Sequence, residues 1–157
     1  MTANRSEDRG PERIAVGIDG SVMSRAALRW AVDHARDGDT VTLVHVWQAS
    51  PTLVGAGIVD PDDDTAARSF AGHELARARS LPHRAGVALD CAVLRGDARE
   101  CLCNLDTDLL VIGARGQGGV TGLLLGSVCS YLARHAHRPL VIVPSPGHTP
   151  DERDEPG

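Results

Sequence analysis

Three glycines and a serine at fixed spacing are the strongest indication of chemistry in this sequence. Gly113 and Gly116 are followed, after nine intervening residues, by the pair Gly126-Ser127. Glycines let main-chain N–H groups approach a ligand, with positive φ where a turn requires it. The first turn of a helix adds unpaired N–H donors and the positive end of the helix dipole. The pattern predicts a polyphosphate site in which the Ser127 hydroxyl contacts phosphate or Mg²⁺, the alternative being a flexible surface loop.

Two charged residues lie near this pattern, and the sequence leaves two interpretations open for each. Asp19 follows the apolar run 14–18, so its carboxylate could accept a hydrogen bond from a ribose hydroxyl. A turn or helix-cap aspartate, stabilising by about 1 kcal/mol, is the alternative. Arg115 lies within the glycine segment, where it either binds a phosphate as a bidentate donor or is a solvated surface residue.

The absence of lysine and the surroundings of His45 and of the acidic residues argue against several other classes of site. The 16 basic residues are all arginine, so neither a Walker A lysine nor a Schiff-base lysine exists. His45 lies in an apolar run, which favours a hydrogen-bonded core histidine. The acidic run of Asp60 and 62–64 is typical of a solvated segment before a helix rather than of a cation site.

Cysteine usage and charge indicate the compartment and the kind of partner. Cys91, Cys101, Cys103 and Cys129 form no CxxC motif, so we interpret them as reduced, mostly buried thiols, with zinc binding the less favoured alternative. No apolar run reaches the roughly 18 residues of a membrane span, and residues 1–13 lack the apolar region of a signal peptide. We expect a cytoplasmic protein without membrane contact. A net charge of −5 argues against a nucleic-acid partner.

The elements that must position these residues alternate between strands and helices. Apolar runs lie at 14–18, 40–46, 87–94, 109–112 and 140–143, and helical periodicity at 24–36, 65–84, 97–105 and 127–137. This order predicts an α/β protein, a doubly wound five-stranded parallel sheet with helices on both faces, Rossmann-like. Ligands of such sheets lie beyond the carboxyl ends of the strands, here between the first and the fourth. We expect one domain, 13–144, between disordered tails at 1–12 and 145–157.

The glycine pattern and both ends of the domain resemble the ATP-binding type of the universal stress protein family. Gly113, Gly116, Gly126 and Ser127 match its motif G-x2-G-x9-G-(S/T) at every spacing. Residues 14–21, IAVGIDGS, resemble the opening V-G-x-D-x-S of the family, and residues 132–144 resemble its closing helix and strand. The resemblance covers about residues 13–144.

The resemblance implies a strand order of 3-2-1-4-5 and a homodimer through strand 139–144. This strand is an apolar sheet edge that invites pairing with a second copy. The alternative is that Pro139 and Pro144 keep the edge unpaired. It also implies ATP bound with Mg²⁺ but without efficient turnover, and therefore no catalytic residue and no metal of its own. By position, the adenine and ribose pocket would be formed by Ile18, Asp19 and Val46; ribose and phosphates would meet Gly113 and Gly116; and the phosphates would bind to Gly126, Ser127 and Val128.

Two departures from the family pattern affect these expectations. Cys129 stands where many relatives have Ser or Thr, which removes an oxygen near the phosphates, and the stretch 96–108 is short by about one helical turn. We expect a nucleotide-dependent regulatory module of the stress response that acts on an unknown protein partner. The alternatives are an interaction protein that binds AMP, cyclic AMP or no nucleotide, and a slow ATP hydrolase.

Overall fold

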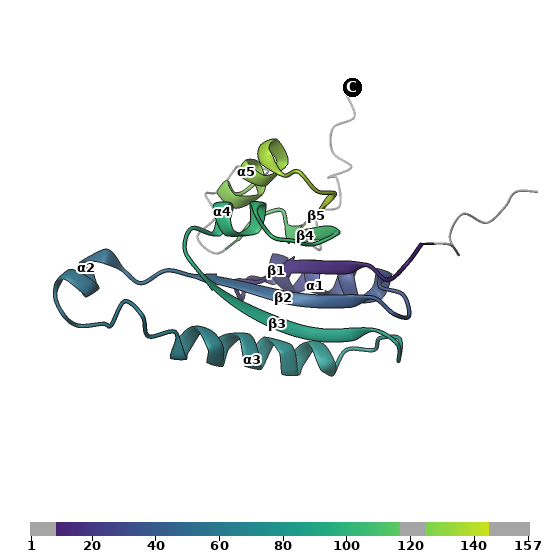
Figure 1. Cartoon of the computed structure of the whole chain (residues 1–157), viewed down its shortest axis with the longest axis horizontal. Coiled ribbons are helices and arrows are strands. Elements are labelled where there is room, and N and C mark those ends of the chain that lie inside the picture. Colours follow the sequence, from purple (N-terminus) through teal and green to yellow (C-terminus); the bar gives the residue numbers. More distant parts are fainter. Residues whose placement is uncertain (1–8, 117–124, 145–157) are drawn as a thin grey trace, which may run out of the picture.

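A five-stranded parallel sheet forms the centre of the molecule (Figure 1). The computed structural model describes residues 9–116 and 125–144. The strands are β1 (Arg13–Gly17), β2 (Thr40–Trp47), β3 (Ala88–Arg95), β4 (Leu109–Gly113) and β5 (Leu140–Val143). Their order is β3-β2-β1-β4-β5, and every neighbouring pair is parallel. The predicted fold class and strand order are therefore confirmed.

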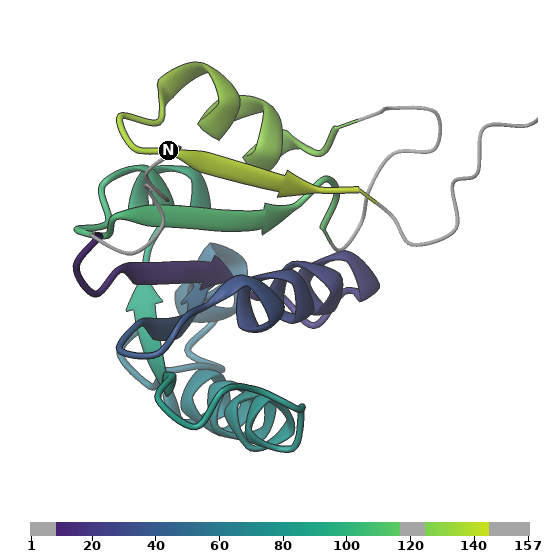
Figure 2. The same ribbon diagram turned by 90° about the vertical axis from the view of Figure 1, so that its right-hand side faces the viewer.

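Helices cover both faces of this sheet, as Figure 2 shows for α1 and α5 on opposite sides. They are α1 (Val22–His34), α2 (Pro51–Gly55), α3 (Thr65–Arg79), α4 (Ala98–Cys103) and α5 (Ser127–His135). Successive residues of a strand point to opposite faces, so Val16 packs under α1 and α3 whereas Ala15 packs under α4 and α5. The result is two aliphatic cores, one on each face of the sheet.

The helix boundaries follow local capping and proline rules. Ser21 is the N-cap of α1, because its side chain accepts a hydrogen bond from the Ser24 amide at 3.1 Å. The helix predicted over 65–84 ends earlier, at Arg79. Pro82 disfavours the helical conformation at the residue before it, so the helix cannot run through this segment. Helix α2 lies within 48–64, where the sequence analysis predicts no element.

The ends of the predicted domain are only partly covered. Residues 1–8, 117–124 and 145–157 lie outside the described residues, so the two predicted tails and the domain bounds stay predictions. Within the described part of the predicted N-terminal tail, the Glu12 amide donates to the buried Asp39 carboxylate at 2.8 Å. Over the ranges 9–116 and 125–144, no helix combines the length and apolar character needed to cross a bilayer.

Candidate functional site

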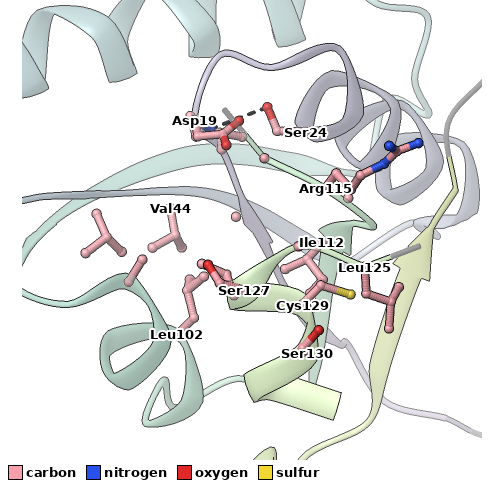
Figure 3. A pocket seen from close by; sticks show the side chains of 18 residues that line it. Asp19, Ser24, Val44, Leu102, Ile112, Arg115, Leu125, Ser127, Cys129 and Ser130 are labelled. Atoms are coloured by element: carbon pink, nitrogen blue, oxygen red, sulfur yellow. Dashed lines mark hydrogen bonds between the residues drawn. The ribbon is translucent and has the colours of Figure 1, made fainter. Parts of the chain in front are cut away.

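A cavity of about 420 Å³ opens at the carboxyl ends of β1 and β4, between α1, α4 and α5 (Figure 3). This is the place where a parallel doubly wound sheet binds ligands. The cavity brings together every site residue predicted from the sequence: Ile18, Asp19, Val46, Gly113, Arg115, Gly116, Gly126, Ser127 and Val128. Residues from distant parts of the chain therefore meet in one hollow, whereas their roles toward a ligand stay predictions.

Asp19 both shapes the turn after β1 and lines the cavity. Its Oδ1 accepts a hydrogen bond from the Ser21 amide at 2.9 Å, and its own amide donates to Ser24 Oγ at 3.4 Å. Gly20 between them has φ 81°, a conformation that favours glycine. The turn interpretation of Asp19 is thus confirmed, and it leaves the carboxylate at the cavity wall, where a ribose contact stays possible.

Gly113, the last residue of β4, and Gly116, three residues further on, must lack a side chain because other atoms come close to them. A Cβ on Gly116 would lie 2.5 Å from Asp19 Oδ2, and one on Gly113 would lie 2.6 Å from Met23 Cβ. Neither residue, nor Gly126, has a positive φ. The expectation that these glycines serve turns of positive φ is therefore wrong. They allow the β4 end to approach the start of α1 closely.

Helix α5 begins at the cavity, with Gly126 as its N-cap and Ser127 as its first residue. The Gly126 amide donates to Ala114 O at 2.8 Å, which corrects the expectation that this N–H binds phosphate. The first backbone hydrogen bond of the helix runs from the Ser130 amide to Gly126 O at 2.9 Å. The amides of residues 127–129 precede this ladder, and among the residues that the structure describes none of them donates to a main-chain oxygen, so they are donors at the positive end of the helix dipole.

One wall of the cavity is apolar and includes residues of α4, a helix predicted at 97–105 but not assigned to the site. Val44 and Leu102 lie together on this side (Figure 3). Leu102 and Ala98 belong to α4, which packs against β2 and α5. Leu102 lies within the helix predicted at 97–105, but no local signal places that helix beside β1. This wall suits a flat apolar group such as a nucleobase.

Cys129 and Arg115, which the sequence analysis places near the phosphates, differ in how they face the cavity. Cys129 is 2 % exposed, and burial raises the pKa of its thiol, so the side chain lines the cavity as a neutral group. Arg115 is half-buried, and its guanidinium points away from Ser127 (Figure 3). The surface interpretation of Arg115 describes this geometry better than a phosphate clamp does.

Comparison with known proteins identifies the family. The model of the universal stress protein family matches residues 11–144. This chain belongs to the universal stress protein family. Universal stress protein Rv1996 of Mycobacterium tuberculosis is 32% identical over 169 aligned residues, which cover 87% of this chain and 51% of the relative. The chain thus spans about half the length of this curated relative.

Solved structures share the fold of this universal stress protein. A family member from Arabidopsis thaliana with AMP bound superposes with a TM-score of 0.60 at 20% identity, covering 90% of this chain and 97% of the other. A universal stress protein in complex with cAMP gives a TM-score of 0.61 at 22% identity, with 88% and 100% covered. At this level of identity the likeness concerns the fold.

His45 and the cysteines are the other candidate residues of this universal stress protein. His45 Nδ1 lies 3.1 Å from Ile18 O and its ring packs on Phe70, in agreement with the predicted hydrogen-bonded histidine. All four cysteines are free thiols, but only Cys129 is buried, so the expectation that most of them are buried is wrong. Within the described part of the chain, no group of three or more His, Cys, Asp or Glu side chains could hold a metal ion.

Proposed function

We propose that this universal stress protein binds ATP in the cavity and acts as a nucleotide-dependent regulatory module of the stress response. The observation that carries the proposal is the meeting of three features in one hollow: the Gly113 and Gly116 segment, the start of α5, and an apolar wall on the opposite side. Each feature suits a different part of one ligand. An adenine nucleotide is the ligand class that uses all three.

The three parts of ATP would meet different residues. Adenine packs against Ile18, Val46 and the apolar side chains beside them. The ribose hydroxyls donate to Asp19, which faces the sugar rather than the phosphates because two anions repel one another. The phosphates accept from the amides of 127–129 at the positive end of α5. Mg²⁺ enters with the nucleotide, and the exposed Ser127 hydroxyl is the group of this chain placed to contact it.

The cavity supports binding more than turnover. Efficient phosphoryl transfer needs charge placed on the phosphates and a group that activates water. The sequence has no lysine, and among the described lining residues the acidic group is Asp19, whose Oδ1 already accepts from Ser21. We therefore expect little or no ATP hydrolysis. Sustained turnover near 1 per second, low for an enzyme, would contradict this expectation.

AMP and cyclic AMP are the second candidate ligands, favoured by the two solved relatives that were crystallised with them. The donors at the start of α5 favour ATP, because they extend the site beyond what a single phosphate next to the ribose requires. The glycine-rich loop 114–125, which we expect nucleotide to order, includes residues outside the described ones.

The module is proposed to work as a cytoplasmic homodimer paired through strand 139–144. Within residues 9–116 and 125–144, β5 is the last strand of the sheet and pairs with β4 alone, so its other edge could pair with a second copy. Four free cysteines fit a reducing compartment. Nucleotide occupancy would then alter a surface that a partner protein recognises.

The decisive experiment asks what the purified protein carries and what stabilises it. The protein is denatured and released nucleotide is separated by chromatography. The emptied protein is then titrated with ATP and Mg²⁺, AMP or cyclic AMP while thermal unfolding is followed. A ligand at 100 times its Kd stabilises by about 2.7 kcal/mol. No shift at millimolar ATP would overturn the proposal, and phosphate release lost in Ser127→Ala would assign slow hydrolysis instead.

A further inference from the structure

The chain between β2 and α3 forms an arm, residues 48–64, that projects away from the sheet (Figure 1). It contains the short helix α2, which has no buried residue. Three of its aliphatic side chains are among the large hydrophobic residues exposed to solvent: Leu53 at 41%, Ile58 at 70% and Val59 at 41%. Apolar side chains gathered on a projecting segment are a common mark of an interaction site.

Local hydrogen bonds give this arm a defined conformation. The Ile58 amide donates to Leu53 O at 2.9 Å and the Gly57 amide donates to Val54 O at 3.0 Å. With Gly57 at φ 68°, these two bonds form a Schellman motif that ends α2. This motif places Ile58 beside the last turn of the helix, next to Leu53. Two of the three exposed aliphatic residues of the arm are therefore brought close together by the backbone.

The two ends of the arm are held to the sheet by one arginine. Arg95, the last residue of β3, lies over the Trp47 ring at 5.9 Å from its centroid and forms an ion pair with Asp62. Trp47 directly precedes the arm, and Asp62 lies near its other end. Arg95 thus bridges both ends, and the arm is a closed loop rather than a free linker.

The arm is also acidic on its exposed side. Residues 48–64 contain four Asp and neither Arg nor Lys. Within the described residues, Asp62 and Asp64 pair with Arg95 and Arg68, whereas Asp60 and Asp63 form no ion pair. Asp60 accepts a hydrogen bond from the Asp62 amide at 2.9 Å, Asp63 accepts one from the Thr65 amide at 3.0 Å, and both carboxylates follow the aliphatic group in the chain. A partner that covers both features must present aliphatic and cationic side chains together.

We propose that the arm docks a short, cationic amphipathic peptide segment of another protein, with aliphatic side chains against Leu53, Ile58 and Val59 and Arg or Lys toward Asp60 and Asp63. The arm of a second copy fits less well, because each arm holds four Asp and neither Arg nor Lys, so two arms brought together repel one another. Three side chains also offer far less than the roughly 1,200 Å² that a stable protein interface buries. The proposal is independent of the nucleotide site.

The test uses a fluorescent helical model peptide of leucine and lysine, about 14 residues long, which is near the minimum for an isolated helix. Its affinity for the full-length protein is measured by anisotropy at low and high salt. We expect Leu53→Ser with Ile58→Ser to weaken binding at least about tenfold, since the apolar contact is lost. Asp60→Asn with Asp63→Asn should weaken binding by about fivefold at low salt, and by less at high salt because salt screens exposed charges.

Matched controls separate docking on the arm from general attraction to an acidic protein. Val22→Ser removes an equally exposed aliphatic side chain elsewhere, and Asp33→Asn with Glu100→Gln changes the net charge by the same amount outside the arm. Both controls should bind the peptide like the unmodified protein. Circular dichroism and the Tm should be alike in all variants, because the changed side chains are exposed.

Three results would overturn the proposal. In the first, arm variants and controls bind the peptide equally. In the second, a peptide with glutamate in place of lysine binds as tightly as the cationic one. In the third, sedimentation shows self-association that disappears in Leu53→Ser with Ile58→Ser, which would assign the arm to a second copy of the chain.

Discussion

The two ends of β1 and β4 are built in opposite ways. At the amino ends, Arg13 forms ion pairs with Asp106 and Asp108 at 3.1 and 3.2 Å, and Thr107 Oγ1 donates to Arg13 O at 2.7 Å. At the carboxyl ends, glycines remove side chains and the first amides of α5 stand ahead of the helical ladder. The polar groups at the amino ends bind one another, whereas the amides at the carboxyl ends line a cavity. The difference separates the end that stabilises the sheet from the end proposed to bind ligand.

The largest effect is expected from a substitution at the carboxyl end of β4. In Gly113→Ala the new methyl group would lie 2.6–2.8 Å from Met23 atoms, including its backbone C and O. Because the backbone cannot yield as a flexible side chain does, β4 and the start of α1 must separate. We expect a loss of about 1–3 kcal/mol of unfolding free energy, measured by urea denaturation, and loss of ATP binding. Unchanged stability would mean that the close approach of Gly113 to α1 is not required.

Gly116→Ala should affect ligand binding while leaving the fold intact. The added Cβ would lie 2.5 Å from Asp19 Oδ2, so the carboxylate must move from its position at the cavity wall. We expect ATP affinity, measured by titration calorimetry, to fall at least about tenfold with little change in the Tm of the nucleotide-free protein.

The matched control is Gly72→Ala in α3, where an added Cβ meets nothing within 4 Å. It should bind ATP normally and raise stability slightly, by about 0.5–1 kcal/mol, since alanine favours a helix. If both alanine variants bind ATP equally well, the contact between Gly116 and Asp19 has no part in ligand binding.

Arg13→Met should affect the amino end alone. It removes the ion pairs to Asp106 and Asp108, which are exposed and therefore contribute little each. We expect a small decrease in Tm and an unchanged shift of Tm by ATP. A loss of ATP binding in this variant would show that the two ends of the sheet are coupled.

The smallest expected effect is the pH dependence of the stability difference between the original protein and Arg13→Met. Hydrogen bonds from Arg13 hold the pKa of Asp106 and of Asp108 below the ordinary value of 3.8. A carboxyl group with a lowered folded pKa stabilises above its unfolded pKa and loses that contribution as pH falls through the folded value. Urea unfolding should therefore show a constant gap between the original protein and Arg13→Met above about pH 5. The gap should close as pH falls below 4, and a gap that widens there would contradict the ion-pair explanation.

Local rules in the sequence predicted most of the fold and part of the site. Short apolar runs located all five strands, and β5 at 140–143 was predicted to the residue. The Ser21 cap was predictable because capping depends on neighbours within one helical turn. The resemblance to a family added the strand order and residues 18, 46 and 128, which do line the cavity.

Contacts between distant segments were not predictable. No local pattern reveals that Gly113 meets Met23, that Gly116 meets Asp19 or that the Gly126 amide is taken by Ala114. The α4 wall of the cavity and the contacts of Arg95 with both ends of the arm also join segments that are distant in the sequence, so no local pattern predicts them.

The sequence alone thus determined which segments become strands and helices and which glycines stand at the ligand end of the sheet, because hydrophobic period and capping act over a few residues. Tertiary structure decided why those glycines must lack a side chain and which amides stay available. Those properties depend on how closely separate elements pack, which appears only when the sheet and both helical layers are assembled.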